Sequence, residues 1–265
     1  MKFRIASDLH LEFWNNYLAR YTLPTLEEDK ETILLLAGDI GLLGDPRTYT
    51  KFIQHSSKQF KGIFWIAGNH EYYHSNIDMR NVKMAINDLA LPNIYTDLHI
   101  LEEEKIAIIG DTLWTDLDNG DPASVFIAQR GMSDFRVIEE GLSLQRFHPI
   151  LLHAERTITF HKEQKQRIFM NVNHYSAKGY KCIVVTHHQP SWQGIGEGFA
   201  GNAMNSAFVS NMDAEIKEYS IAYWIAGHTH NAREYMIGET KVIVNPLGYP
   251  SERDAYFNPT LTIEV

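Results

Sequence analysis

The sequence predicts an α/β fold with α+β character, in which two mixed β-sheets pack face to face and helices cover their outer sides as a four-layer αββα sandwich. Apolar runs such as residues 32–37 suit strands that are covered on both faces. The early strands alternate with helical patterns, whereas the later part of the chain is richer in hairpins. No repeat, low-complexity stretch or linker rich in Pro, Gly or Ser interrupts the chain, so we expect residues 1–265 to form a single domain.

The elements of the first half follow from local patterns. Pro46 fits the first position of a helix that extends to about residue 60, because the backbone N–H that proline lacks is not needed there. Residues 76–89 carry a second helical pattern, and residues 99–110 predict a hairpin whose turn is the charged run 102–105. Apolar runs predict strands over residues 2–7, 32–37 and 62–67.

In the second half, residues 149–175 carry the longest helical pattern. Another helix is predicted by the spacings of four, four and three residues along Phe208, Met212, Ile216 and Tyr219. Residues 233–245 predict a hairpin around Gly238. Strands over residues 181–185, 221–226 and 260–265 complete the expected set.

The composition is that of a soluble globular protein, with 44% hydrophobic and 22% charged residues. No apolar run reaches the roughly 18 residues of a membrane helix, and the N-terminal residues lack the apolar core of a signal peptide. Cys182 is the only cysteine, which excludes an internal disulfide and suits the cytoplasm. The net charge of −9 argues against a long nucleic-acid partner, and ordinary solubility accounts for it.

Metal-binding side chains follow five of the predicted strands. Because residues i and i+2 of a strand point the same way, Asp8 and His10 can converge on one ion. His228 and His230 have the same spacing, but they follow Gly227, and a turn there could aim them at two neighbouring ions. The five clusters are Asp8-Leu9-His10, Gly38-Asp39, Gly68-Asn69-His70-Glu71, Thr186-His187-His188 and Gly227-His228-Thr229-His230.

These clusters predict two adjacent metal sites at the carboxyl edge of the sheet, where open α/β folds place their chemistry. Carboxylate, amide and imidazole ligands suit divalent Mn, Fe, Zn, Co or Ni. Taken singly, each residue has an ordinary structural explanation, such as a loop-bracing Asp or a hydrogen-bonded His. The metal interpretation depends on the clusters occurring together.

The series Asp-x-His, Gly-Asp, Gly-Asn-His-Glu, Thr-His and Gly-His-x-His spans residues 8–230 and resembles the calcineurin-like metallophosphoesterase superfamily. The resemblance implies a pair of mixed sheets flanked by helices. It also implies that Asp39 bridges two metal ions, and that the non-ligand His70 contacts the phosphoryl group or protonates the leaving oxygen. The implied ligands of the first ion are Asp8, His10 and His230, and those of the second are Asn69, His187 and His228.

The net charge of the implied site suggests which reaction it catalyses. Two divalent ions, the carboxylates of Asp8 and Asp39 and a bridging hydroxide sum to about +1, which attracts a phosphate ester. Two ions roughly 3.5–4 Å apart stabilise the attacking and leaving oxygens of an in-line displacement. We therefore expect hydrolysis of a small phosphomonoester or phosphodiester, such as a nucleotide or cyclic nucleotide, with inversion at phosphorus and no phosphoenzyme.

Two alternatives stay open. A nuclease is the first, although the chain lacks the long basic stripe that duplex DNA favours. The second is a catalytically silent interaction module, because some relatives have lost activity. Such a loss should show as missing ligands, whereas this chain has all seven together with His70.

One position departs from the family pattern. Many relatives carry an acid three residues after the bridging aspartate, and that acid often orients the catalytic histidine. Here the position is Leu42, so we expect His70 either to be a poor general acid or to be oriented by another residue, such as Glu71 or Asp45.

Several further segments have both a functional and a structural interpretation. The glycine-rich segment 190–206 is either a mobile lid over the metals or a surface loop. Its match to a dinucleotide motif at residues 196–201 does not lie at a strand-to-helix turn, so we interpret it as accidental. The other candidates for the pocket are Tyr72, Tyr73, His74, Trp114, Arg130, Arg136, His188 and residues 245–250.

Overall fold

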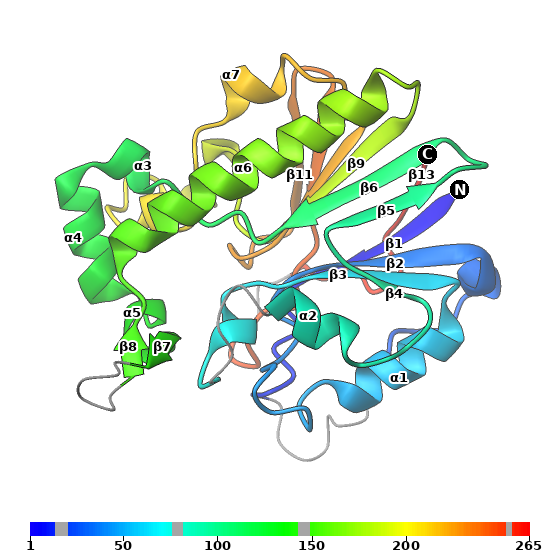
Figure 1. Ribbon diagram of the computed structural model, residues 1–265, viewed down its shortest axis with the longest axis horizontal. Coiled ribbons are helices and arrows are strands. Elements are labelled where there is room, and N and C mark those ends of the chain that lie inside the picture. Colours follow the sequence, from blue (N-terminus) through cyan, green and yellow to red (C-terminus); the bar gives the residue numbers. More distant parts are fainter. Residues whose placement is uncertain (14–20, 76–81, 143–148, 253–255) are drawn as a thin grey trace.

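Two large β-sheets face each other across a shared apolar core, and helices cover their outer sides (Figure 1). The computed structural model describes residues 1–13, 21–75, 82–142, 149–252 and 256–265. The expected mixed sheets flanked by helices are confirmed.

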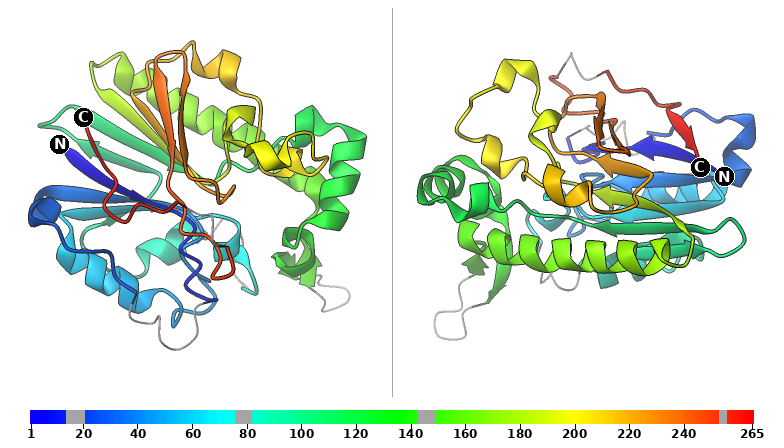
Figure 2. Two further views of the ribbon diagram at one scale, coloured as in Figure 1. Left: turned by 180° about the vertical axis from the view of Figure 1, so that it is seen from behind. Right: turned by 90° about the horizontal axis from the view of Figure 1, so that it is seen from above.

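The first sheet has five strands in the order β13-β1-β2-β3-β4. The four strands from β1 to β4 run parallel, and β13 pairs antiparallel with β1 at the edge. The two chain ends therefore lie side by side, as both views of Figure 2 show. The strand bounds are β1 Lys2–Ala6, β2 Thr32–Ala37, β3 Gly62–Ile66, β4 Ile94–Tyr95 and β13 Thr262–Glu264.

The second sheet has six strands in the order β11-β12-β10-β9-β6-β5. Its four central strands run parallel, and hairpins add β11 and β5 antiparallel at the two edges. The strand bounds are β5 Leu98–Leu101, β6 Ile106–Asp111, β9 Lys181–Thr186, β10 Tyr223–Ala226, β11 Arg233–Ile237 and β12 Thr240–Val244.

Alternation along the strands sorts the apolar side chains into three layers. Phe3, Ile5, Ile108 and Ile183 belong to the layer between the sheets. The outer face of the first sheet packs under α1 (Thr50–Gln59) and α2 (Val82–Asn87), and the outer face of the second packs under α6 (Ala154–Ser176) and α7 (Asp213–Ile216). No helix in the described residues is long and apolar enough to cross a bilayer.

Two predicted helices begin later than expected. Pro46 starts a turn rather than a helix, and α1 begins only at Thr50. Residues 149–151 are the strand β8 (Pro149–Leu151), because they pair with β7 (Glu139–Leu142) before α6 begins. For the helix predicted over residues 76–89, the structure describes α2 from Val82, and residues 76–81 lie outside the described part.

The helix predicted from Phe208 to Tyr219 is mostly irregular. Met212 and Ile216 are buried as expected, but only Asp213–Ile216 is helical. The sequence also gave no signal for the elements between β6 and β7, which are α3 (Leu117–Gly120), α4 (Pro122–Gly131) and α5 (Asp134–Val137). The 3-10 turns are η1 Glu27–Glu31, η2 His70–Tyr72, η4 Trp192–Gly194, η5 Glu197–Phe199 and η6 Asn205–Ala207.

Candidate metal centre

The eight predicted site residues come from the carboxyl ends of five parallel strands. The loop after β1 supplies Asp8 and His10, and the loops after β2 and β3 supply the next three residues. The second sheet supplies the others from the ends of β9 and β10. Because parallel strands end at the same edge, the two sheets present these loops to each other.

Backbone conformation aims most of these side chains. Five of the seven predicted ligands have positive φ, the left-handed region that residues other than glycine seldom adopt. Such strain persists only where the surrounding structure holds it, and it concentrates at functional sites. The five residues and their φ angles are Asp8 at 52°, His10 at 44°, Asp39 at 55°, His228 at 71° and His230 at 47°.

Two glycines make room for the cluster. A Cβ on Gly68 would lie 2.1 Å from Asp39 Oδ1, and a Cβ on Gly38 would lie 2.5 Å from His187 Nδ1. Gly38 also has a φ of 82°. Side chains at these two positions would displace the candidate ligands, which explains physically why Gly precedes Asp39 and Asn69.

The first group is formed by Asp8, His10 and His230. The Nε2 atoms of His10 and His230 lie 2.9 Å apart, and Asp8 Oδ1 lies 3.4 Å from His230 Nε2. One ligand atom from each of the three residues falls within 4.8 Å of the other two. This geometry fits the set of residues implied for the first ion.

The second group is formed around His187. Its Nε2 lies 2.9 Å from Asn69 Oδ1 and 3.1 Å from His228 Nδ1. Its other nitrogen, Nδ1, is 2.9 Å from the carbonyl oxygen of Ala37, which can only accept, so Nδ1 carries the hydrogen. A neutral His187 therefore presents the lone pair of Nε2 to its neighbours.

Asp39 lies between the two groups. Its Oδ2 is 3.4 Å from His187 Nε2 on one side and 3.6 Å from His10 Nε2 on the other. Its Oδ1 accepts a hydrogen bond of 2.8 Å from the backbone N–H of His70. The side chain is buried and immobilised by that bond, as a ligand shared by two ions should be.

The second group favours a positive charge at its centre. Asn69 Nδ2 donates to Asp134 Oδ1 at 2.8 Å, so its Oδ1 is the atom that faces His187 Nε2. An amide oxygen, a carboxylate and a ring nitrogen thus converge in a buried space, and a positive charge there, either a proton on His187 or a bound cation, stabilises them. Burial alone lowers the pKa of His187, but Asp39 outweighs it and raises the pKa to about 9.

The first group also favours a positive charge at its centre. The Nδ1 atoms of both histidines face carboxylates, with His10 Nδ1 3.2 Å from Glu12 and His230 Nδ1 2.7 Å from Glu252. These carboxylates favour ring hydrogens on Nδ1, so that both Nε2 atoms are directed at the same space, where a proton or a bound ion would lie between them. Asp8 Oδ2 is also buried without a hydrogen-bond partner among the described residues. These donors fit a divalent ion.

His70 is oriented by Glu12, and the expectation that Glu71 or Asp45 would do so is wrong. Glu12 Oε1 lies 2.8 Å from His70 Nδ1. His70 Nε2 is then directed toward the hydroxyl of Tyr249 at 3.2 Å. Asp45 instead binds Arg47 at the surface. Glu12, which comes from another loop, thus orients His70 as an acid at position 42 does in many relatives.

Glu71 holds the two loops that carry Asp39 and Asn69. Its Oε2 accepts from the backbone N–H groups of Asp39 at 2.9 Å and Gly68 at 2.7 Å. Its Oε1 accepts from the backbone of Ile40 at 2.8 Å and from Trp65 Nε1 at 3.3 Å. Burial, with Asp39 next, raises the pKa of Glu71 to about 7.

Replacing Glu71 with Gln should lower the free energy of unfolding by about 2–4 kcal/mol at about pH 8, where the carboxylate is ionised. The amide NH₂ of glutamine would face N–H donors that the carboxylate now accepts from. Urea denaturation of the metal-free protein measures the effect without a contribution from bound ions. Glu103→Gln, in the exposed turn before β6, is the control, and equal stability of the two variants would contradict this role.

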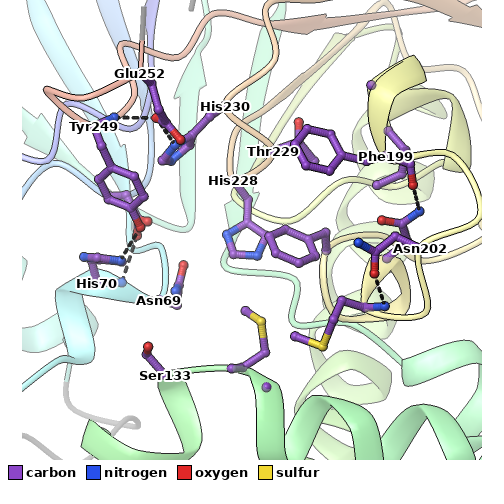
Figure 3. A pocket seen from close by; sticks show the side chains of 18 of the residues that line it. Asn69, His70, Ser133, Phe199, Asn202, His228, Thr229, His230, Tyr249 and Glu252 are labelled. Carbon is purple, nitrogen blue, oxygen red and sulfur yellow. Dashed lines mark hydrogen bonds and ion pairs between the residues drawn. The ribbon is translucent and has the colours of Figure 1, made fainter.

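A cavity of about 440 Å³ opens beside both groups. Asp39, Asn69, His70 and His228 are among the residues that line it, and Figure 3 shows several of the lining side chains. No lysine or arginine lines it within the ranges that the structure describes. Positive charge for an anionic substrate would therefore come from metal ions.

The structure decides between the alternatives left open for several other residues. Trp114 is a core residue, and His188 packs on it with the ring centroids 5.0 Å apart. Arg130 stacks over Phe126, and Arg136 donates to backbone carbonyls, so neither lines the cavity. Other residues from the segments with two interpretations do line the cavity. They are Tyr73, Tyr249 and, from residues 190–206, Ile195, Gly196, Phe199, Asn202, Met204 and Asn205.

Three site residues were missed from the sequence: Glu12, Asp134 and Glu252. For Glu12 a signal existed, since Asp8, His10 and Glu12 alternate with buried leucines and share one strand-like face. The other residues lie far from the predicted clusters in the sequence, and the sequence around them shows no comparable alternation.

The chain is similar to several known proteins. A family model described as calcineurin-like phosphoesterase matches residues 1–232. Uncharacterized protein L509 of Acanthamoeba polyphaga mimivirus is 27% identical over 279 residues, covering 99% of this chain and 96% of that protein.

Two solved structures share the fold. Phosphopantetheinyl hydrolase from Mycobacterium tuberculosis gives a TM-score of 0.72 at 14% identity, over 96% of this chain and 94% of that chain. A dimetal phosphatase from Danio rerio gives a TM-score of 0.52 at 13% identity, over 94% of this chain and 88% of that chain. At these identities the likeness concerns the fold alone.

Proposed function

Because the chain belongs to the calcineurin-like phosphoesterase family, we propose that this hydrolase uses two divalent metal ions to cleave a small phosphomonoester or phosphodiester. Asp8, His10 and His230 would hold the first ion. Asn69, His187 and His228 would hold the second. Asp39 would contribute to both.

One observation supports two ions rather than one. Asp39 Oδ2 is within 3.6 Å of His10 Nε2 and within 3.4 Å of His187 Nε2. A single ion could occupy one of the two histidine groups, but the convergent ligand atoms of the other group would then hold only a proton. A carboxylate shared by two ions satisfies both groups.

Bound there, two ions would supply Lewis acidity that lowers the pKa of a water molecule and stabilises charge on the attacking and leaving oxygens. Hydrolysis forms one P–O bond to the water oxygen and breaks the P–O bond to the leaving group. The water gives up one proton to solvent, and the leaving oxygen takes one. His70 is the donor, because Glu12 holds its Nδ1 and leaves Nε2 facing the cavity.

This scheme needs no serine or cysteine nucleophile, so we propose a single displacement with inversion at phosphorus. A small substrate fits the cavity better than a nucleic acid does. Nucleic-acid binding depends on lysine and arginine contacts to successive phosphates, and the described lining offers none. A nuclease stays the second candidate.

A phosphoester screen tests the proposal. The purified protein would be stripped of metal, reloaded in turn with Mn, Fe, Zn, Co or Ni, and assayed on generic mono- and diesters. We expect turnover only with metal and close to two equivalents bound. A fully loaded protein that turns over no phosphoester would favour a silent binding module, and steep loss of affinity with salt on DNA would favour a nuclease.

Glu12→Gln should lower kcat by about 10–100-fold, because partners that orient a ligand or catalytic group have effects of this size. Glutamine keeps the shape but weakens the contact with His70. Leaving groups of high pKa, which depend most on a proton donor, should suffer more than p-nitrophenolate.

Glu252→Gln is the matched control for that variant. Glu252 contacts Nδ1 of His230, a proposed metal ligand, and no hydrogen bond joins it to His70 among the described residues. Glu252→Gln should weaken metal binding without making kcat depend more steeply on the pKa of the leaving group. If both variants change the leaving-group dependence equally, Glu12 does not act through His70.

A further inference from the structure

One wall of the cavity is apolar. Ile195, Phe199, Met204 and Phe208 contribute to it from the segment after β9, and Met132 faces them from the end of α4. The cavity volume of about 440 Å³ falls within the range of about 300–1,000 Å³ that small-molecule sites occupy. The wall is large enough to hold an organic group next to the phosphoryl group.

The wall begins directly at the metal centre. The ring of Phe208 stacks on His228, with the centroids 4.7 Å apart and an interplanar angle of 29°. An organic group on this wall would thus be attached to a phosphorus atom that lies at the two histidine groups. Phe199 stands farther out and is 61% exposed, so a bound ligand would remove apolar surface from water.

Hydrogen bonds hold the wall in place. Asn205 is buried and donates from Nδ2 to the carbonyl oxygen of Phe199 at 2.8 Å. Arg233 donates to the carbonyl oxygen of Ile195 at 2.6 Å. Met204 lies where a Cβ on Gly131 would be, only 2.5 Å away, so the two sides of the wall pack together. A preformed surface of this kind selects ligands by shape.

The proposed proton donor, His70, lies on the side of His228 opposite to Phe199 of the apolar wall. In Figure 3, His70 and Tyr249 are on one side of His228, and Phe199 and Asn202 are on the opposite side. A leaving group that takes its proton from His70 must point toward His70. The apolar wall is therefore available to the group that stays on phosphorus.

We infer that the substrate is a phosphodiester whose retained ester group is uncharged and aromatic or otherwise apolar, seated against Phe199, Met204 and Phe208. This inference rests on the proposed function, because it takes His70 as the proton donor. A monoester has no second organic group and would leave the wall unused. The product would be a phosphomonoester that carries the apolar group.

The test uses three substrates with one leaving group: phenyl p-nitrophenyl phosphate, methyl p-nitrophenyl phosphate and p-nitrophenyl phosphate. With the metal-loaded protein, kcat/KM for the phenyl diester should exceed that for the methyl diester by about 10-fold or more. The monoester should be the poorest substrate. Phe199→Ala should reduce the phenyl-to-methyl ratio several-fold.

Phe126→Ala is the matched control, because Phe126 is 58% exposed on α4 and does not line the cavity. It should keep the wild-type ratio. A phenyl-to-methyl ratio near one, an unchanged ratio in Phe199→Ala, or a monoester preference would overturn this inference while leaving the proposed function intact. Failure to hydrolyse any of the three, with both metals bound, would overturn both.

Discussion

Asp39→Asn should abolish most turnover, by about 10³-fold or more, because it removes a carboxylate that faces both histidine groups. The amide has a single oxygen and no negative charge, so it cannot link two cations and balance them at once. Metal analysis of the purified variant should give fewer ions per chain than the wild type, with the loss largest for the more weakly held ion.

Asp45→Asn provides the control for this variant, since Asp45 pairs with Arg47 at the surface, away from the cluster. It should bind metal and turn over substrate as the wild type does. Asp39→Asn with full metal content and ordinary kcat would contradict the bridging role, whereas an unfolded variant would show in its circular dichroism spectrum.

His70→Ala should slow turnover by about 10²–10⁴-fold while sparing metal content, because in the proposed mechanism His70, held by Glu12, donates a proton and binds no ion. The loss should grow with the pKa of the leaving group. Measuring kcat for a series of substituted phenyl esters gives this dependence directly, and it distinguishes a missing proton donor from a general loss of structure.

His74→Ala is a suitable control, because His74 lies four residues further on and is exposed outside the cavity. It should behave as the wild type. If His70→Ala instead lost its metal ions, His70 would be a ligand, in line with the alternative grouping in which His10, Glu12 and His70 lie within 4.8 Å of one another.

The sequence predicts much of this site because the information is local. A strand ends at a glycine or polar residue, and the side chains that follow, such as Asp8, Asp39 and His187, must lie at one sheet edge. Their chemistry then limits what they can hold. The two groups that the structure brings together contain the same residues that the resemblance implied.

What the sequence did not predict depends on contacts between distant segments. Leu42 pointed to a missing acid, but only the fold shows that Glu12 reaches His70 from 58 residues away. Tyr249 reaches the same ring from a separation of 179 residues.

The wrongly predicted helix from Phe208 to Tyr219 has a related cause. Phe208 shares a helical spacing with Met212 and Ile216, yet its ring packs on His228 instead of continuing a helix. Tertiary contacts override a short local pattern there. Periodicity alone therefore identified the apolar residues of this segment but not its conformation.

Anomalous diffraction from crystals of the manganese-loaded protein would test the central claim most directly. We predict two peaks roughly 3.5–4 Å apart, the spacing of two-metal hydrolytic sites, with Asp39 between them. Asp8, His10 and His230 should surround one peak, and Asn69, His187 and His228 the other. A single peak bound by His10, Glu12 and His70, with Asp39 uncoordinated in a fully loaded crystal, would contradict the account.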